Sequence, residues 1–241
     1  MEKSELISII LPTYNEKVNV VTLIESIGRV LSDWNYEILL VDDNSQDGTY
    51  QIVKDLQNDY VRTFIRKDGK SLGKSIRYGL ESARGSKIVV MDSDLNHRAD
   101  YLPFMIGSLA YYDCVIASRF LYGGGMGPDW SNKVHNCLSW LFNLLIRVTL
   151  GTSVTDSLYG YFAIKRSVLD EISYDDIFWG YGDYCIRLMY YLQKNEINIL
   201  QFPAVNGSRI EGLGNRSFIS VLFHYTYATI FLAIKNRLFK R

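Results

Sequence analysis

The chain of 241 residues carries 26 Lys and Arg against 26 Asp and Glu, so its formal net charge is zero. This balance excludes the strongly basic composition by which proteins attract nucleic acid, and we expect no nucleic-acid partner. Apolar residues make up 48% and charged residues 22% of the chain, which is typical of a globular protein and excludes a disordered one.

Short apolar runs alternate with helical patterns along the first half of the chain. Apolar runs that predict buried strands cover residues 6–11, 37–41, 61–65 and 87–91. Apolar residues at helical spacing predict helices over 18–31, 49–56 and 72–83. Strands that alternate with helices are typical of βαβ units around a mostly parallel sheet, so the predicted fold class is α/β.

The second half continues this pattern, with a glycine run at 123–125 that predicts a flexible loop. Strands are expected at 115–118, 162–164 and 197–202, an apolar segment covers 134–150, and a helix is expected at 184–192. The sequence contains neither an internal repeat nor a low-complexity linker. We therefore predict one domain with a C-terminal appendage.

Polar and acidic residues follow three of the predicted strands. Thr13-Tyr-Asn-Glu16 follows the first, Asp42-Asp43-Asn44 the second and Asp92-Ser-Asp94 the fourth. Asp and Asn also start turns and cap helices, but neighbouring like charges need a cation or hydrogen-bond donors nearby. Because ligands bind beyond the carboxyl ends of strands in open α/β sheets, the sequence predicts one shared site at this edge.

The two ends of the chain and its cysteines bear on location. Cys114, Cys137 and Cys185 are too few and too scattered for a disulfide framework or a zinc site, which favours buried thiols in a reducing compartment. The N-terminus lacks the basic segment and long apolar core of a secretory signal. We therefore expect a cytoplasmic protein.

The C-terminal stretch from Ser217 to Ile234 contains no Asp, Glu, Lys or Arg, and basic residues follow it within 235–241. Its length lies at the lower limit for a transmembrane helix. Three interpretations stay open: a helix in the membrane interface, a true span, and a helix buried in the core or in an oligomer. We favour the interfacial helix, because it leaves the domain and the basic tail on the same cytoplasmic side.

The ordered motifs resemble those of family 2 glycosyltransferases, the inverting GT-A type. The chain is most similar to the branch of dolichyl-phosphate mannose synthases and polyprenyl-phosphate glycosyltransferases. The matching pieces are Leu-Pro-Thr-Tyr-Asn-Glu at 11–16, Val-Asp-Asp-Asn-Ser-Gln-Asp-Gly-Thr at 41–49, Lys70-Ser-Leu-Gly-Lys74, Met-Asp-Ser-Asp-Leu-Asn-His at 91–97, Ser118-Arg119-Phe120, Thr155-Asp156, Gly160-Tyr161-Phe162, and Arg209 with Gly212. Ser71 stands where the family usually has glycine.

The resemblance implies a GT-A (Rossmann-like) domain over residues 1–216, with a mostly parallel sheet flanked by helices. It leaves 217–241 as an apolar or amphipathic, membrane-associated helix with a basic tail. It also implies that Asp92 and Asp94 hold a divalent cation, Mg²⁺ or Mn²⁺, on the diphosphate of a nucleotide sugar. The residues expected to bind that donor are Pro12, Tyr14, Glu16, Asp42, Asp43, Lys74 and Asp92.

The resemblance also implies a phosphate-binding role for Arg119, Arg209 and Arg216, because a guanidinium matches phosphate oxygens. A structural role for these arginines stays open. With Asp94, Arg119 and Arg209, Asp183 completes the predicted catalytic set. His97 is open between the metal shell and a packing role.

The nature of the acceptor depends on whether a base is present. A sugar hydroxyl needs a carboxylate to take its proton, whereas a lipid phosphate is already an anion. Asp183 is the candidate base, while Ile186-Arg187 stands where the lipid-phosphate branch often has Glu. We favour transfer to a polyprenyl (dolichyl-type) phosphate at the cytoplasmic face of a membrane. Transfer to a sugar hydroxyl and non-catalytic nucleotide-sugar binding stay as alternatives, and the oligomeric state is open.

Overall fold

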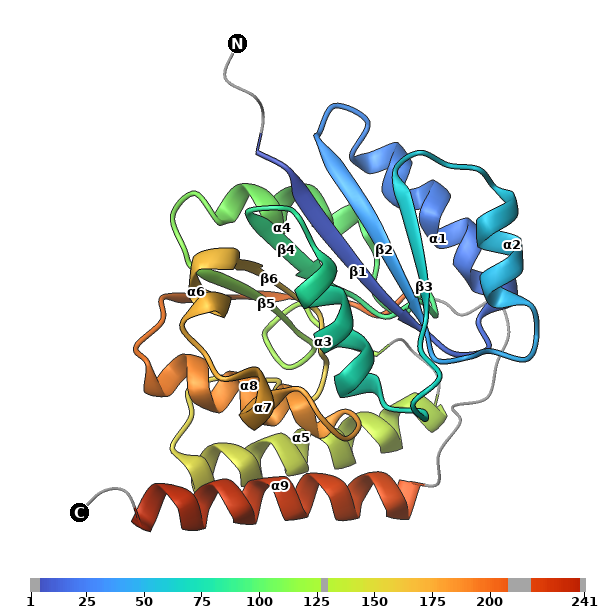
Figure 1. Cartoon of the computed structure of the whole chain (residues 1–241). Coiled ribbons are helices and arrows are strands. Elements are labelled where there is room, and N and C mark those ends of the chain that lie inside the picture. The colour runs from blue at the N-terminus through green and yellow to red at the C-terminus, as the bar shows by residue number, and fades with distance from the viewer. Residues whose placement is uncertain (1–4, 127–129, 208–217, 239–241) are drawn as a thin grey trace.

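The computed structural model describes residues 5–126, 130–207 and 218–238 (Figure 1). Within these ranges, the side chains of 130–135, 218–222 and 236–238 are not described. The predicted acceptor-phosphate residues Arg209 and Arg216 lie outside the described residues.

Strands and helices alternate along most of the chain, as the apolar pattern predicts. The strands are β1 (Ile7–Thr13), β2 (Tyr36–Asp42), β3 (Val61–Ile65), β4 (Lys87–Val90), β5 (Cys114–Ser118), β6 (Phe162–Lys165) and β7 (Ile199–Pro203). The helices are α1 (Lys17–Val30), α2 (Thr49–Asp55), α3 (Leu72–Ser82), α4 (Leu102–Ser108), α5 (Trp130–Leu150), α6 (Arg166–Asp170), α7 (Tyr174–Ile177), α8 (Asp183–Lys194) and α9 (Phe218–Leu238), with a 3₁₀ turn η1 (Ala99–Tyr101). The sequence pattern does not predict α4, α6 and α7, because such short helices give too few turns to show a period.

The described strands form one sheet in the order β3-β2-β1-β4-β6-β5-β7. The strands β3, β2, β1 and β4 are parallel, and β5 is parallel to β7. Only β6 among the described strands runs antiparallel to its neighbours, β4 and β5. The mostly parallel α/β sheet predicted from the sequence is therefore confirmed.

The strand order reverses between β1 and β4. The chain passes from β1 outward through β2 and β3, then returns to place β4 on the other side of β1. Backbone and side-chain bonds join the two carboxyl ends, since the Met91 N–H donates to Ile10 O at 3.2 Å and the Ser93 hydroxyl donates to Pro12 O at 2.9 Å. Such a switch point is where open α/β sheets bind their ligands.

Helices cover both faces of the sheet (Figure 1). Alternate residues of β1 enter different cores: Ile9 and Leu11 pack with α1 and α4, and Ile10 packs with α3 and α8. A strand buried on both faces reads as a continuous apolar run rather than an alternating one, which explains the pattern of the sequence.

The C-terminal helix α9 lies beside α5 and packs on α8 (Figure 1). Leu232 of α9 is fully buried in a small core with Ile146 of α5 and Ile186 of α8. The predicted C-terminal helix is thus present, and one of its sides belongs to the folded body. In the part of the chain that the structure describes, no helix combines the length and apolarity needed to cross a membrane.

The packing of α3 on β1 gives a first prediction. A Cβ on Gly79 would lie 2.5 Å from Cγ2 of Ile10, a fully buried side chain. We expect Gly79→Ala to lower the free energy of unfolding by about 1–3 kcal/mol, as overpacked cores do, measured by urea denaturation. The matched control is Gly107→Ala in α4, where the described atoms leave open space around an added Cβ. That variant should be neutral or more stable by up to about 1 kcal/mol, and equal losses in the two variants would contradict the prediction.

Candidate active site at the carboxyl ends of β1, β2 and β4

Asp42 ends β2 and organises the loop that follows it. Its carboxylate accepts from the backbone N–H of Ser45 at 2.7 Å and from the Ser45 hydroxyl at 2.6 Å. The next residue, Asp43, donates its N–H to the carbonyl of Thr13 at 2.9 Å, which ties this loop to the end of β1. Hydrogen-bond donors for the first of the two neighbouring acids are therefore present.

Asp43 obtains its counter-charge from Arg66, which follows β3. The two side chains are 4% exposed, and Nη1 of Arg66 donates to one carboxylate oxygen of Asp43. The other oxygen accepts from the Ser71 N–H at 2.7 Å, and the Ser75 hydroxyl also donates to Asp43. These hydrogen bonds turn the Asp43 carboxylate toward α3. Contact between Asp43 and the nucleotide sugar stays a prediction.

The loop between α7 and α8 holds the N-terminus of α3. Ser71 is the N-cap of this helix, and its hydroxyl donates to Gly180 O at 2.7 Å. The Gly73 backbone passes so close to Trp179 that a Cβ would lie 2.6 Å from the Trp179 carbonyl oxygen. The departure from the family pattern at Ser71 therefore supplies a bond that glycine could not make. The Lys74 side chain, 52% exposed, extends from the first turn of the helix.

The end of β1 and the segment after it carry three more residues predicted to bind the nucleotide sugar. Pro12 is buried in β1, and its carbonyl holds Ser93. Tyr14 is half-buried, with Nζ of Lys70 3.4 Å from the centre of its ring. Glu16 precedes α1 and accepts from the side-chain amide of Asn19 at 2.8 Å.

The loop after β4 carries the two predicted metal ligands. Asp94 is buried and accepts from the N–H and the side-chain amide of Asn96 at 3.0 and 2.9 Å. Asp92 keeps 38% of its side chain exposed. Groups of three or more His, Cys, Asp or Glu that could hold a metal are absent from the described residues. Two carboxylates fit Mg²⁺ or Mn²⁺, because such cations also take oxygens from waters and from a substrate diphosphate.

His97 packs beneath this loop and holds its backbone. Its Nδ1 accepts from the Asp92 N–H at 2.8 Å, so Nε2 is left to donate to Tyr159 O at 3.0 Å. The ring is 1% exposed and stacks on Tyr161, and burial lowers the pKa of His97 to about 4. Of the two interpretations of His97, this geometry supports the packing role, because both ring nitrogens are engaged.

The segment after β7 reaches the same loop. Gly125 pairs with Val205, and the Gly207 N–H donates to Asn96 O at 2.8 Å. The described part of this segment therefore ends beside the loop that carries Asp94. Arg209 follows two residues later, outside the described residues.

Arg119 is paired with Asp156 rather than exposed. Its Nε and Nη2 donate to the two carboxylate oxygens of Asp156 at 2.8 and 3.0 Å, and the Asp156 side chain is fully buried. Burial alone would lower the pKa of the Arg119 guanidinium, but the Asp156 carboxylate outweighs burial and raises it. The guanidinium also lies over the ring of Tyr159 at 4.7 Å. A phosphate-binding role for Arg119 stays a prediction.

Asp183 lies at the start of α8 and is 1% exposed. One carboxylate oxygen accepts from the Tyr181 N–H at 2.7 Å, and the other accepts from Nη1 of Arg187 at 2.5 Å. Burial lowers the pKa of the Arg187 guanidinium, and the attraction of Asp183 opposes this shift. Both oxygens of the candidate base are thus engaged in holding the loop and the helix together.

Arg66 and Arg187 are the site residues that sequence reasoning does not identify. Arg66 directly follows β3, so the rule that places strand ends at one edge could have included it. Arg187 lies four residues after Asp183 in a helix, which is the spacing of an ion pair. The burial of that pair depends on the loop between α7 and α8, which the spacing alone does not reveal.

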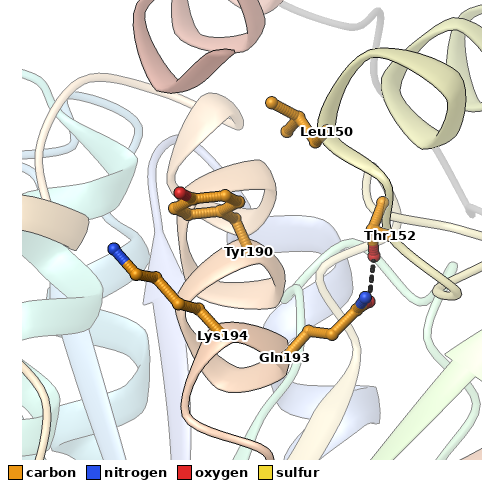
Figure 2. Close-up of a pocket in the computed structure, with 5 residues that line it drawn as sticks. All are labelled: Leu150, Thr152, Tyr190, Gln193 and Lys194. Atoms are coloured by element: carbon orange, nitrogen blue, oxygen red, sulfur yellow. Dashed lines mark hydrogen bonds between the residues drawn. The ribbon is translucent and has the colours of Figure 1, made fainter. Parts of the chain in front are cut away.

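A small pocket of about 130 Å³ lies elsewhere, at the C-terminal ends of α5 and α8 (Figure 2). Its lining includes Leu150, Thr152 and Tyr190, and the amide of Gln193 accepts from the Thr152 hydroxyl at 2.7 Å. Lys194 ends α8, about 16 Å along the helix from Asp183 by its length. The pocket is therefore separate from the site at the strand ends.

Residues 8–173, more than half of the chain, match glycosyl transferase family 2, and the chain belongs to this family. It is 29% identical over 210 residues to the dolichol-phosphate mannosyltransferase of Pyrococcus furiosus, which covers 86% of this chain and 58% of that protein. The identity is also 29% over 175 residues to the protein of the same name from Saccharomyces cerevisiae, covering 70% and 64%. The chain thus spans less than two thirds of the length of these curated relatives.

Solved structures confirm the GT-A-like fold. Glucosyl-3-phosphoglycerate synthase from Mycobacterium tuberculosis, in complex with Mn²⁺, UDP and phosphoglyceric acid, matches with a TM-score of 0.70 at 20% identity, covering 95% of this chain and 78% of that one. Mannosyl-3-phosphoglycerate synthase from Rubrobacter xylanophilus matches with a TM-score of 0.65 at 20% identity, covering 97% and 74%. At such identities the likeness shows the fold.

The pairing of Arg119 with Asp156 gives a second prediction. Asp156→Asn leaves a buried guanidinium without its counter-charge, and we expect the free energy of unfolding to fall by about 3–5 kcal/mol in urea denaturation. The control is Asp113→Asn, which breaks the half-exposed pair of Asp113 with Lys165 and should cost less than about 1 kcal/mol. A loss for Asp156→Asn as small as that of the control would show that the Arg119 pair does not stabilise the fold.

Proposed function

We propose that this chain is a metal-dependent, inverting glycosyltransferase that moves a sugar from a nucleotide sugar to a polyprenyl phosphate at the cytoplasmic face of a membrane. Its membership of glycosyl transferase family 2 supports the transfer reaction. The names of the relatives from P. furiosus and S. cerevisiae support a polyprenyl-type phosphate as acceptor. The UDP and Mn²⁺ in the M. tuberculosis structure support a nucleotide-sugar donor and a divalent cation.

The state of Asp183 is the observation that carries the choice of acceptor. A hydroxyl acceptor needs a carboxylate that can take a proton, whereas a phosphate attacks as an anion. Asp183 is buried, and its two carboxylate oxygens accept from the Tyr181 N–H and from Arg187. A carboxylate held in this way is not placed to take a proton from a hydroxyl. This arrangement suits a phosphate acceptor, which needs no base.

The proposed reaction uses the chain's own residues for binding and orientation. The donor lies across the ends of β1, β2 and β4, with its nucleoside beside Pro12, Tyr14 and Asp42 and its diphosphate near Lys74 and the N-terminus of α3. An oxygen of the acceptor phosphate attacks the anomeric carbon and forms the new bond. The bond from this carbon to the diphosphate oxygen breaks, the configuration inverts, and the nucleoside diphosphate leaves with the bonding electron pair.

Asp92 and Asp94 are the residues that would hold the divalent cation in this proposal. A bound Mg²⁺ or Mn²⁺ supplies neutralisation of the charge on the diphosphate. Arg119, Arg209 and Arg216 are proposed to meet the acceptor phosphate. In that role Arg119 would use Nη1, since its Nε and Nη2 are bound to Asp156.

The surface of α5 and α9 supports a location at the membrane. Each helix carries large apolar side chains that are exposed at helical spacing, and the two helices lie side by side at one end of the molecule (Figure 1). These side chains are Leu138, Trp140, Leu141, Leu144, Leu145 and Val148 of α5 and Phe223, Tyr227, Ile230, Phe231 and Ile234 of α9. Apolar helices of this kind, with basic residues at one end, bind the headgroup boundary of a bilayer.

The transfer itself is tested with purified protein, Mn²⁺, polyprenyl phosphate and radiolabelled nucleotide sugars. We expect label in the organic phase, and a loss of about a hundred-fold or more in Asp94→Asn, because a bound cation is worth several kcal/mol to phosphate chemistry. The control is Asp100→Asn, which alters only an exposed pair with Arg98. A folded Asp94→Asn variant with near-normal transfer would refute the metal role, and slow hydrolysis of a donor without labelled lipid would indicate that the acceptor is not a polyprenyl phosphate.

The membrane surface is tested by flotation with vesicles of phosphatidylcholine and phosphatidylglycerol. We expect Leu145→Glu and Ile230→Glu each to weaken binding about ten-fold or more, because each removes an apolar side chain from the interface and adds a negative charge. Tyr111→Glu is the matched control, since Tyr111 is 82% exposed but lies outside α5 and α9. Unchanged flotation of the two helix variants would contradict the proposed surface.

A further inference from the structure

We propose that Arg187 is a positioning residue that locks the loop between α7 and α8 against the N-terminus of α3, and so fixes the turn that carries Lys74, the residue proposed to lie near the donor diphosphate. This inference rests on the proposed function for the identity of the ligand. The lock itself is a property of this chain's own contacts. It involves no contact of Arg187 with substrate.

Arg187 binds the loop through several of its guanidinium nitrogens at once. Nε donates to Ile177 O at 2.9 Å, Nη2 donates to Trp179 O, and Nη1 donates to the Asp183 carboxylate. The guanidinium also lies 3.7 Å from the centre of the Trp179 ring. A side chain that is 1% exposed and binds both ends of a turn leaves that turn little freedom.

The loop fixed in this way touches α3 where the helix begins. Ser71 donates its hydroxyl to Gly180 O at 2.7 Å, and the Gly73 N–H donates to the same carbonyl at 3.4 Å. The Gly73 backbone lies against the Trp179 carbonyl, and Arg187 donates a hydrogen bond to the same carbonyl. Movement of this loop would therefore move the first turn of α3.

The first turn of α3 carries Lys74, whose side chain is proposed to lie near the donor diphosphate and is 52% exposed. The N–H groups of Ser71, Gly73 and Lys74 already donate to Asp43, to Gly180 O and to the Ser71 hydroxyl oxygen. The positive charge offered at this turn is therefore that of the Lys74 side chain, together with the helix dipole. Because the direction of the Lys74 side chain follows that of the turn, a loop that fixes Ser71 and Gly73 would act on donor affinity at a distance.

Two variants test the lock without any ligand. Arg187→Lys keeps the charge opposite Asp183 but loses the planar group that reaches several partners, and Gly73→Ala pushes on the Trp179 carbonyl while Arg187 stays intact. In hydrogen–deuterium exchange we expect the amides of residues 71–75 to exchange about ten-fold faster in either variant, the effect of a lost hydrogen bond. Amides in the core of α1 and the variant Arg29→Met, on the exposed last turn of α1, are the controls.

A rise limited to residues 71–75 supports the lock. An equal rise in the α1 amides shows only a general loss of stability and overturns it, as does unchanged exchange in a folded Arg187→Lys protein. If Arg187→Lys does not fold, exchange in Gly73→Ala decides whether the loop between α7 and α8 holds the first turn of α3.

The link to the donor is tested by calorimetric titration with UDP and with GDP, each in the presence of Mn²⁺. Arg187→Lys and Ser71→Ala should each weaken binding about ten-fold, and the double variant should lose less than the sum, because both act through the position of Gly180. Additive losses, or unchanged affinity in Arg187→Lys, overturn the inference. If the wild-type protein binds neither nucleotide, the proposed donor is wrong, while the exchange measurement still decides the lock.

Discussion

The buried ion pair between Asp43 and Arg66 is the contact on which the candidate site depends. It joins the end of β2 to the end of β3, and the same carboxylate accepts from Ser71 and Ser75 of α3. A buried carboxylate without partners would cost several kcal/mol, but here one oxygen accepts from Arg66 and Ser75 and the other accepts from the Ser71 N–H. The strand ends and the first turn of α3 therefore form one rigid edge before any ligand arrives.

Two further pairs of arginine and carboxylate repeat this arrangement on the other side of the site. Arg119 with Asp156 fixes the end of β5, and Arg187 with Asp183 fixes the start of α8. In both pairs the carboxylate oxygens are taken by donors of the chain itself. Carboxylates engaged in this way anchor the backbone around the site, and this is the observation on which the proposed choice of a charged acceptor rests.

The sequence predicts where these acids lie better than it predicts what they touch. The rule that strand ends share an edge places Asp42, Asp43 and Asp94 together, because it depends only on local pattern and parallel connection. It does not show that Asp43 faces Arg66, since that contact depends on how the loop after β3 packs on α3. The uncharged stretch near the C-terminus likewise predicts a helix, but which side of α9 is buried follows from the position of α5 and α8.

The C-terminal helix α9 connects the proposed membrane surface to the loop between α7 and α8. Tyr225 of α9 lies so close to Gly182 that a Cβ there would be 2.5 Å from its hydroxyl oxygen. Gly182 precedes Asp183, so α9 rests on the same loop that Arg187 binds and that holds the start of α3. About one and a half turns further along the helix, the exposed Ile230 belongs to the apolar surface of α5 and α9. A lipid surface that binds these exposed side chains would therefore bear on a helix that is already packed against the loop between α7 and α8.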